Sequence, residues 1–462
     1  MTRIFYMVVK TLLIGLTVFG MGNFGFMPFF PAKDLTGEVT PAGDSALYLQ
    51  IEAEDEGWDT YEPGRVYGGY RYGPSMILNA DGSLDVFSAT NGTFGYWDVI
   101  TYKRLYCGGK IRTKETVAVK PTAGSMDALS TCDPGAIKIG DYYYIGYTST
   151  MDERGVDNDV YVARSKRPGG PYEKWDGKGW GGDPVPLLDW QGDPNVGGAM
   201  EPAFVLMGDT LYIYSNWGGP VLVSTADATD ENWPATVVMH GEAIPDTYGE
   251  IGDVGDSKDV KYVDAFGRFV AVCTTKRFSD ESYVSVWESF DGLTFRPSGF
   301  VKTNTAKKLH NCGISGRADG HICEGDPVYL SYGYGPGWGT WGTRMHRVAL
   351  SLADKPKTDP ENEQNLDIPV ETHNERAIPE VITIAAQDPV MTVTDSEHIW
   401  IFAYDSDNFN TPILAGICYE GYDRSVIRIV GNRVFAVGTG ETRVTAHWNG
   451  YTCDFVVKAQ KQ

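Results

Sequence analysis

The chain alternates short runs of β-branched and aromatic residues with turns rich in glycine, aspartate and asparagine. Between about residues 48 and 350 it lacks the 3.6-residue hydrophobic period of a long amphipathic helix. Residues 130–148 show the pattern most clearly, with an Asp-Pro pair, a short apolar strand, a Gly-Asp turn and an aromatic strand in succession. Apolar and aromatic flanks around such a turn predict a β-hairpin. The fold class is therefore expected to be all-β.

The same hairpin pattern recurs along the chain, roughly every 50 to 70 residues. Residues 200–214 repeat the order of acid, proline, strand, Gly-Asp turn and aromatic strand, and residues 73–87 hold a weaker copy that begins with Gly-Pro. Two further units open at residues 258–263 and 310–315. Strand-rich repeats of this length predict propeller blades. We expect a five-bladed β-propeller over residues 48–352.

The two ends of the chain depart from this repeat. Residues 1–30 place two basic residues before an apolar run, which is typical of an export signal, and an uncleaved membrane anchor is the alternative. Residues 31–47 and 353–377 are rich in proline and polar residues and are expected to be linkers. Residues 378–462 return to a two-residue period, which predicts a small β-sandwich. The body of the protein is therefore expected to be secreted or held at the cell surface.

Charge and cysteine content narrow the partners and the compartment. The 462 residues carry 61 acidic and 39 basic side chains, a formal net charge of −22. This disfavours nucleic acid and anionic membranes as partners, because no basic patch would offset phosphate repulsion, but it is compatible with a neutral sugar polymer. Seven cysteines allow disulfides such as Cys312–Cys323 and Cys418–Cys453, with buried reduced thiols as the alternative.

Short motifs within the repeats resemble those of glycoside hydrolase family 43 and its relatives. Those proteins are five-bladed propellers that act on furanosides and pentosides. The resemblance covers about 300 residues and rests on Asp133-Pro134, residues 142–144, Glu201-Pro202, residues 163–175 and His310-Asn311.

The resemblance implies that the inner strands of the blades converge on a central pocket. By blade order, Asp133 is similar to an aspartate that tunes and orients, and Glu201 is similar to the general acid. The first blade departs from the pattern, because Gly73 stands where the family has the aspartate that acts as the general base. Three options remain: Asp133 has taken the role of the base, a nearby acid such as Asp98 or Asp59 reaches in, or the chain is not a hydrolase of the usual kind.

Cleavage of a glycosidic bond needs one protonated and one ionised carboxyl group. Glu201, if desolvated by neighbours such as Trp217, would hold its proton near neutral pH, whereas Asp133 and Asp259 would stay ionised. Strand alternation places Asp259 opposite to Lys258, so it could line the pocket as an auxiliary carboxylate or pair with a lysine on the surface. We expect the reaction to proceed with inversion.

Aromatic residues and one histidine complete the predicted site. Tryptophans near blade ends or in glycine-rich loops could stack on a sugar ring, although packing between blades is the commoner role. In the resembling family the histidine that matches His310 helps to hold an ion on the propeller axis, so a structural Ca²⁺ is one option. A hydrogen-bonded histidine is the safer interpretation, because Ca²⁺ needs six to eight oxygen ligands. The predicted substrate-binding residues are Trp97, Trp217, Trp338, Trp341, His310 and Asn311.

The sequence therefore predicts an exported, monomeric glycoside hydrolase that needs no cofactor for catalysis. The resemblance points to a pentose-containing polysaccharide such as arabinan or xylan as substrate. Residues 433–440 resemble group-2 bacterial immunoglobulin-like modules, so the predicted β-sandwich is expected to be Ig-like. The alternative function is a non-catalytic carbohydrate-binding or surface-adhesion propeller, which Gly73 favours.

Overall fold

The computed structural model shows an all-β chain, as predicted. No α-helix occurs among the residues that it describes, and these residues include no helix long and apolar enough to span a membrane. The chain divides into two units, Met1–Thr36 and Gly37–Gln462. The predicted export segment, residues 1–30, lies outside the described residues. The structure describes residues 45–61, 70–91, 97–106, 111–152, 154–245, 256–335, 341–368, 383–386, 389–399, 401–404, 410–412, 417–448 and 450–461.

Four sheets follow one another along the chain and form the first four blades of a propeller. Blade 1 contains β3 (Tyr72–Leu78), β4 (Leu84–Asn91), β5 (Asp98–Tyr106), β6 (Ile111–Arg112) and β7 (Thr116–Val119). Blade 2 contains β8 (Cys132–Ile139), β9 (Tyr142–Ser149), β10 (Asp159–Ser165) and β11 (Glu173–Lys174). Blade 3 contains β12 (Ala199–Met207), β13 (Thr210–Trp217), β14 (Val221–Asp227), the 3-10 helix η1 (Trp233–Thr236) and β15 (Val238–Ile244). Blade 4 contains β16 (Asp256–Val263), η2 (Asp264–Phe266), β17 (Arg268–Thr275), β18 (Tyr283–Ser289), β19 (Arg296–Val301) and the short β21 (His321–Ile322).

Blade 5 joins the two ends of the propeller. It contains β20 (Leu309–Ile314), β22 (Val328–Tyr334), β23 (Gly342–Ala353), β1 (Tyr48–Ala53) and β2 (Trp58–Tyr61). The N-terminal strand β1 pairs antiparallel with β23, from Tyr48 opposite Ala353 to Ala53 opposite Val348. The first described strand therefore completes the last sheet, so the blades form a closed ring with only short outer edges. The predicted five-bladed propeller is confirmed.

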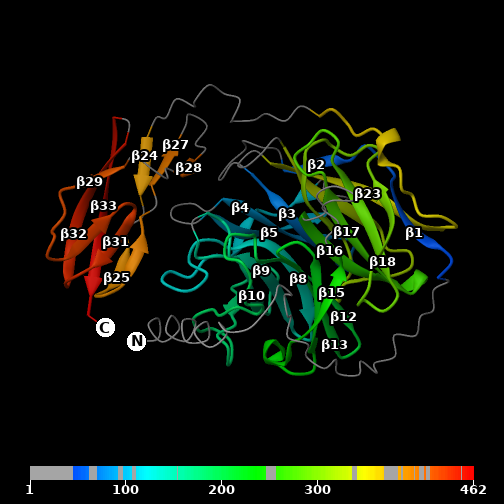
Figure 1. The fold of residues 1–462 in the computed structure, drawn as a ribbon, viewed down its shortest axis with the longest axis horizontal. Helices are drawn as coiled ribbons and strands as arrows, with labels where there is room; N and C mark the ends of the chain where they lie inside the picture. The colour runs from blue at the N-terminus through cyan, green and yellow to red at the C-terminus, as the bar shows by residue number, and fades with distance from the viewer. Residues whose placement is uncertain are drawn as a thin grey trace, which may run out of the picture. The chain divides into compact units, whose positions relative to one another are not determined.

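The first strand of each blade faces a common axis, around which the blades are arranged in Figure 1. Each of the inner strands β3, β8, β12, β16 and β20 contacts the next, and β20 contacts β3. Apolar clusters fill the space between neighbouring blades; Val272 of blade 4 and Leu330 of blade 5, for example, belong to one cluster and are fully buried. Burial of this apolar surface holds the blades together, since no backbone ladder joins most of them.

A left-handed backbone residue interrupts four of the inner strands near their N-terminal ends. The register of each strand shifts at this point, which is the pattern of a β-bulge. A bulge bends the strand and re-aims a side chain, and left-handed residues other than glycine are uncommon and costly. The residues and their φ angles are Gly73 (57°), Asp133 (48°), Glu201 (55°) and Asn311 (36°). The bulges therefore aim equivalent positions of different blades at the same axis.

Residues 316–320 cover the end of the axis away from these bulges. Their backbone carbonyls accept hydrogen bonds from residues near the C-terminal ends of the inner strands of blades 1 to 4. The pairs are Leu78 N to Gly316 O (2.7 Å), Lys138 N to Ala318 O (2.7 Å), Leu206 N to Asp319 O (2.9 Å) and Tyr262 N to Gly320 O (3.0 Å). One segment thus joins four blades and closes this end of the axis.

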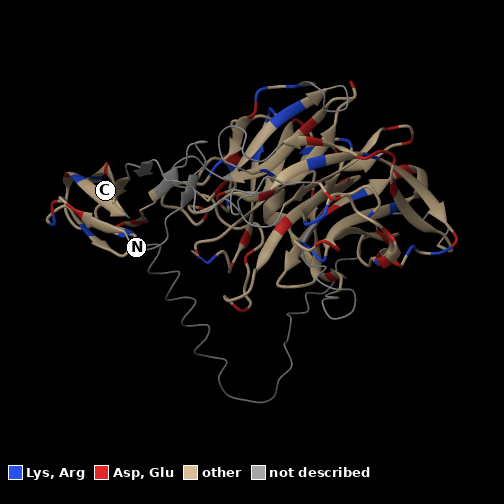
Figure 2. Cartoon of the chain, turned by 90° about the horizontal axis from the view of Figure 1, so that it is seen from above, with Lys and Arg blue, Asp and Glu red and all other residues tan. Residues whose placement is uncertain are grey.

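A buried ion pair ties blade 4 to the closing strand. The guanidinium of Arg268 lies 2.7 Å from the carboxylate of Glu288, and both side chains are fully buried. The same carboxylate accepts a hydrogen bond from the backbone N–H of Leu49 in β1 (2.9 Å). Other charged side chains are spread over strands and loops, with acidic and basic residues interspersed (Figure 2).

The C-terminal residues form three further small sheets around a separate apolar cluster that includes Ile401, Val434 and Phe455. The Ig-like identity of this part stays a prediction. Within the predicted linker, the 3-10 helix η3 (Pro360–Asn362) forms and Leu366 N donates to Thr305 O (2.5 Å). The strands are β24 (Thr383–Ala386), β25 (Val390–Thr392), β26 (Ser396–His398), β27 (Ile401–Tyr404), β28 (Asn410–Pro412), β29 (Cys418–Glu420), β30 (Ile427–Val430), β31 (Arg433–Ala436), β32 (Gly440–Trp448) and β33 (Tyr451–Gln460).

The described cysteines are all free thiols, so neither disulfide considered from the sequence forms. Cys418 lies opposite His447, and Cys453 lies opposite Ala446. Strand β32 therefore separates the two cysteines of the C-terminal part. Cys312 is buried in the cluster between blades 4 and 5, which agrees with the alternative of a buried reduced thiol.

The axis is packed too tightly at Gly313 to accept a side chain. A Cβ atom there would lie 1.9 Å from the carbonyl oxygen of Pro74 in blade 1. We expect Gly313→Ala to destabilise the protein by about 3 kcal/mol, because the backbones of two inner strands must move apart. Thermal or urea unfolding measures this loss. Gly179→Ala is the matched control, since nothing lies within 4 Å of its Cβ position; equal stability of the two variants would contradict the packing described.

Candidate active site

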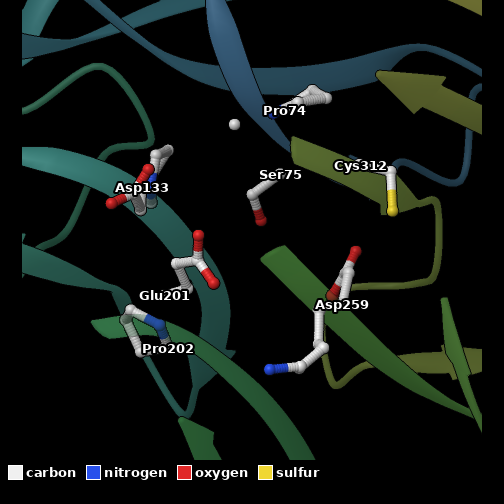
Figure 3. A pocket seen from close by; sticks show the side chains of 10 residues that line it. Pro74, Ser75, Asp133, Glu201, Pro202, Asp259 and Cys312 are labelled. Atoms are coloured by element: carbon white, nitrogen blue, oxygen red, sulfur yellow. The ribbon is translucent and has the colours of Figure 1, made fainter. Parts of the chain in front are cut away.

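A pocket lies on the propeller axis at the N-terminal ends of the inner strands. All five blades contribute to its lining (Figure 3). The lining residues are Gly73, Pro74, Ser75, Asp133, Pro134, Glu201, Pro202, Lys258, Asp259 and Cys312. The three predicted catalytic carboxyl residues, Asp133, Glu201 and Asp259, thus meet in one pocket although up to 126 positions separate them in the sequence.

Asp133 and Glu201 share a hydrogen-bond donor from a third blade. The side-chain amide of Asn311 lies 3.0 Å from Asp133 Oδ1 and 3.4 Å from Glu201 Oε1. Figure 3 shows the two carboxyl groups on the same side of the pocket. One amide nitrogen can reach both carboxyl groups only if these converge. The bulges of blades 2, 3 and 5 therefore direct their side chains to the same point. Asn311 thus holds the two acids in place, and its predicted contact with substrate stays a prediction.

Further contacts orient the Glu201 side chain. Its second oxygen accepts a hydrogen bond from the amide of Asn216 on the neighbouring strand β13, and its backbone N–H donates to Thr148 Oγ1 of blade 2 (2.9 Å). Glu201 is 6 % exposed. A buried carboxyl group with amide donors on both oxygens has a defined position, which is what proton transfer to a bound substrate requires.

Asp259 lies across the pocket from this pair (Figure 3) and is held by a buried ion pair. Its carboxylate contacts Lys261 Nζ and accepts a hydrogen bond from Ile314 N (3.0 Å). The partner lysine is 4 % exposed, so the pairing is internal rather than on the surface. Lys258 and Asp259 occupy consecutive positions of the ladder between β16 and β17, just beyond a register shift, and both line the pocket.

Blade 1 brings no carboxyl group into the pocket at the bulge position. Gly73 occupies it, and a Cβ atom there would have ordinary contacts, 3.4 Å from Asp133 Cα and 3.7 Å from Asp133 Oδ1. Asp59 is engaged elsewhere, in an ion pair with Arg344 (2.9 Å). Asp98 is 1 % exposed and accepts hydrogen bonds from two tyrosines, so it lies behind the pocket wall and not in the lining.

His310 lies in an aromatic cluster. Its ring centroid is 4.2 Å from Trp341, 5.1 Å from Tyr72 and 5.0 Å from Phe278. Aromatic faces do not supply the oxygen ligands that Ca²⁺ requires, so these neighbours do not fit the ion considered from the sequence. Among the described residues, no group of three or more His, Cys, Asp or Glu side chains is arranged to hold a metal.

The predicted sugar-stacking tryptophans are not part of the pocket lining in the described residues. Trp341 is fully buried in the cluster around His310, so its ring faces are covered, which corrects its predicted role as a sugar platform. Trp217 is half-buried at the end of β13 and packs edge-on against Trp190. Trp97 is half-buried before β5, and Trp338 lies outside the described residues. Contact of Trp97 or Trp217 with a substrate stays a prediction.

Sequence reasoning missed three residues of the site. Asn216 follows an aromatic strand without any motif, Ser75 was treated only as part of a weak hairpin, and Lys258 was placed on the opposite face from Asp259. Ser75 Oγ accepts a hydrogen bond from Ala136 N (3.0 Å) and so joins blades 1 and 2 below the carboxyl pair. The repeat itself offered a signal for Ser75, because Ser75 and Asp259 each stand two residues beyond the bulge of their strand.

Comparison with known proteins gives matches only among solved structures. No family model matches the chain, and no curated protein matches it. The matching structures include glycoside hydrolases of several families. The chain is similar to an α-L-arabinofuranosidase from Podospora anserina in complex with cellotriose, at 12 % identity over 65 % of this chain and 97 % of that chain, with a TM-score of 0.45.

Two further matches are also glycoside hydrolases. A family 117 glycoside hydrolase from the marine bacterium Zobellia galactanivorans has 15 % identity over 66 % of this chain and 92 % of that chain, with a TM-score of 0.44. A family 43 β-xylosidase/α-arabinofuranosidase from a compost microbial metagenome, in complex with xylotriose, has 14 % identity over 66 % of this chain and 99 % of that chain, with a TM-score of 0.45.

Replacing Asn311, whose amide contacts both Asp133 and Glu201, with an acid tests the geometry of this carboxyl pair. We expect Asn311→Asp to lower the free energy of unfolding by about 1–3 kcal/mol at pH 8, because two carboxylates lose a donor and gain a like charge. The loss should be smaller at pH 4, where more carboxyl groups are protonated. Denaturant unfolding at the two pH values measures the difference.

Asn195→Asp is the matched control, since Asn195 is exposed in a loop beside Arg154 and should change stability little at either pH. A loss in Asn311→Asp that is the same at pH 4 and pH 8 would show that the amide does not bridge two acids.

Proposed function

We propose that this protein is a glycoside hydrolase whose catalytic groups are Asp133 and Glu201. The observation that supports the proposal is their convergence, from adjacent blades, on one amide in an axial pocket. A simple turn cap would not bring two carboxyl groups from different blades to one amide. Hydrolysis of a glycosidic bond commonly uses two carboxyl groups in one pocket.

In the proposed reaction Glu201 is the acid. It donates its proton to the glycosidic oxygen as the bond between that oxygen and the anomeric carbon breaks. Asp133 acts as the base and accepts a proton from the water that attacks the anomeric carbon. The proton then returns to Glu201 through solvent, so both carboxyl groups regain their starting states. Asp259, held by Lys261, keeps the wall opposite the pair rigid.

The stereochemical outcome depends on the distance between the two acids. Asn311 contacts an oxygen of each at 3.0 and 3.4 Å, so these two oxygens are closer than the roughly 6.5–9.5 Å that separates carboxyl groups in inverting enzymes. Retaining enzymes have carboxyl groups about 5–5.5 Å apart. Inversion stays our prediction, and the anomer first released by the enzyme decides between the two.

The proposed substrate is a neutral, pentose-containing polysaccharide outside the cell, as the sequence motifs suggest. The net charge of −22 supports a neutral rather than an anionic ligand.

Gly73 favours a second candidate function, a carbohydrate-binding propeller without catalysis. At the position equivalent to Asp133 and Glu201, blade 1 has no side chain. The pocket then has carboxyl groups from blades 2 and 3 on one side and an ion-paired aspartate on the other. A site of this kind could bind a sugar hydroxyl group without activating a water.

Substitution of the two acids tests catalysis directly. We expect Glu201→Gln and Asp133→Asn each to reduce sugar release at least about 100-fold on any polysaccharide that the wild type cleaves, because each removes a proton-transfer group. Release of reducing sugar from a panel of arabinans and xylans measures activity. Asp141→Asn, in an exposed turn of blade 2, is the control and should retain full activity. Full activity of both pocket variants would exclude the proposed roles, and binding without sugar release would support the second candidate.

Gly73→Asp separates the two candidates. The backbone at Gly73 has the same left-handed conformation as Asp133, and the added side chain has room. If Asp133 is the base, a like charge beside it should reduce activity near neutral pH by about tenfold. A rise in hydrolysis would instead show that the natural pocket lacks a base. Gly140→Asp, at φ 56° with nothing within 4 Å of its Cβ position, controls for the backbone conformation.

A further inference from the structure

A fourth carboxyl group, which does not line the pocket, is buried in blade 1. Asp98 begins β5 of blade 1, is 1 % exposed, and accepts hydrogen bonds on both oxygens. Tyr70 donates to Oδ1 (2.6 Å) and Tyr72 donates to Oδ2 (2.9 Å). A buried carboxyl group held by two neutral hydroxyl groups, with no basic group among these hydrogen-bond partners, has little to stabilise a negative charge.

A backbone hydrogen bond joins Asp98 to the segment of blade 2 that carries Asp133. The backbone carbonyl of Asp98 accepts a hydrogen bond from Thr131 N (3.0 Å), and the next residue, Cys132, contacts Asp133 Oδ2 through its thiol (3.3 Å). Burial, followed by the charges of Asp133 and Asp98, raises the pKa of the Cys132 thiol. The thiol therefore lies within the field of both aspartates.

Among the described residues, the groups that interact with Asp98 come from two parts of the chain. Tyr70 and Tyr72 face it from the start of blade 1, and Cys132 and Asp133 face it from β8. The pKa of Asp98 is raised to about 7 in total: burial raises it most, the tyrosine hydrogen bonds lower it, and the charge of Asp133 raises it. His310 stacks on the Tyr72 ring, with the ring centroids 5.1 Å apart.

We infer that Asp98 is a positioning residue for Asp133: it carries the proton of the Asp98–Asp133 pair and thereby leaves the negative charge on the carboxylate that faces the pocket. The inference rests on the proposed function in that it assigns Asp133 the role of base. Two carboxyl groups that interact share their protons unequally, and the more buried one retains its proton to higher pH. A protonated Asp98 can still use both tyrosines, because a phenol oxygen accepts as well as donates a hydrogen bond.

This arrangement explains how the site could work with Gly73 in blade 1. Blade 1 contributes the carboxyl group of Asp98 from its third strand, β5. This group is buried and does not line the pocket. Its neutral form adds no repulsion at Asp133, while its hydrogen bonds to Tyr70 and Tyr72 fix the part of blade 1 that precedes the Gly73 bulge.

The test is a direct titration that does not depend on activity. In protein labelled with ¹³C at the aspartate carboxyl carbons, the signal lost in Asp98→Asn identifies Asp98. We expect this signal to titrate near pH 7 in the wild type and at lower pH in Asp133→Asn, where the neighbouring charge is removed. A midpoint near pH 4 in the wild type, or an unchanged midpoint in Asp133→Asn, would overturn the inference.

Stability gives a second readout. A carboxyl group with a raised pKa in the folded state adds stability that is complete below about pH 4 and is lost as the pH rises through about 7. We expect the folding equilibrium constant of the wild type to fall relative to that of Asp98→Asn by up to tenfold per pH unit between about pH 5 and 7. Tyr72→Phe keeps the ring and removes one donor, so it should move this window to higher pH. A constant ratio between wild type and Asp98→Asn would contradict the inference.

Activity then tests the link to the proposed function. Because Asp98 is neutral on the acidic side, Asp98→Asn should leave the acidic limb of kcat/KM, which reports the base, at the same pH as in the wild type. A shift of that limb by about one pH unit to lower pH would show that Asp98 carries a charge there. If no sugar is cleaved but the titration behaves as expected, the proposed function fails and the coupling of the two carboxyl groups stands.

Discussion

The geometry of the site depends on the left-handed bulge near the start of the inner strands. In ordinary β-structure, side chains alternate between the two faces of a blade, and none points along the axis of a propeller. A residue with φ near +50° breaks that alternation and turns its side chain toward the axis. Asp133, Glu201 and Asn311 adopt this conformation in three different blades and meet at one point.

A strained conformation of this kind persists only when the surrounding structure holds it. Here the support comes from both ends of the axis. Residues 316–320 bind the C-terminal ends of four inner strands, and the close approach of Gly313 to Pro74 sets the spacing between blades 5 and 1. The closing strand β1 is joined to blade 4 by the buried Glu288. The ring therefore acts as a rigid frame that fixes the distance between carboxyl groups from separate blades.

Two sets of hydrogen bonds surround the pocket. In one, Asp98 accepts from Tyr70 and Tyr72; in the other, contacts run from Cys132 and Asp133 through Asn311 to Glu201 and Asn216. A backbone hydrogen bond from Thr131 N to Asp98 O joins the two sets. Tyrosine hydroxyl groups and asparagine amides donate to these acids, and the Lys261–Asp259 pair lies on the opposite wall. Such a network separates the carboxyl groups by environment, since one is deeply buried and the others reach the pocket. Acids in different environments can take different protonation states at one pH.

The sequence by itself determined the all-β class, the five repeats and the two acids at equivalent repeat positions, because hairpin periodicity and turn residues act over a few neighbouring positions. Only the tertiary structure decided what those acids contact. Asn311 and Asn216 reach Glu201 across 110 and 15 positions, and Asp259 pairs with a buried Lys261 rather than with a lysine on the surface. Trp341 looked like an exposed platform in a glycine-rich loop, yet it fills a core between blades. Burial and side-chain direction depend on how distant strands pack around the axis, and local sequence pattern does not encode that.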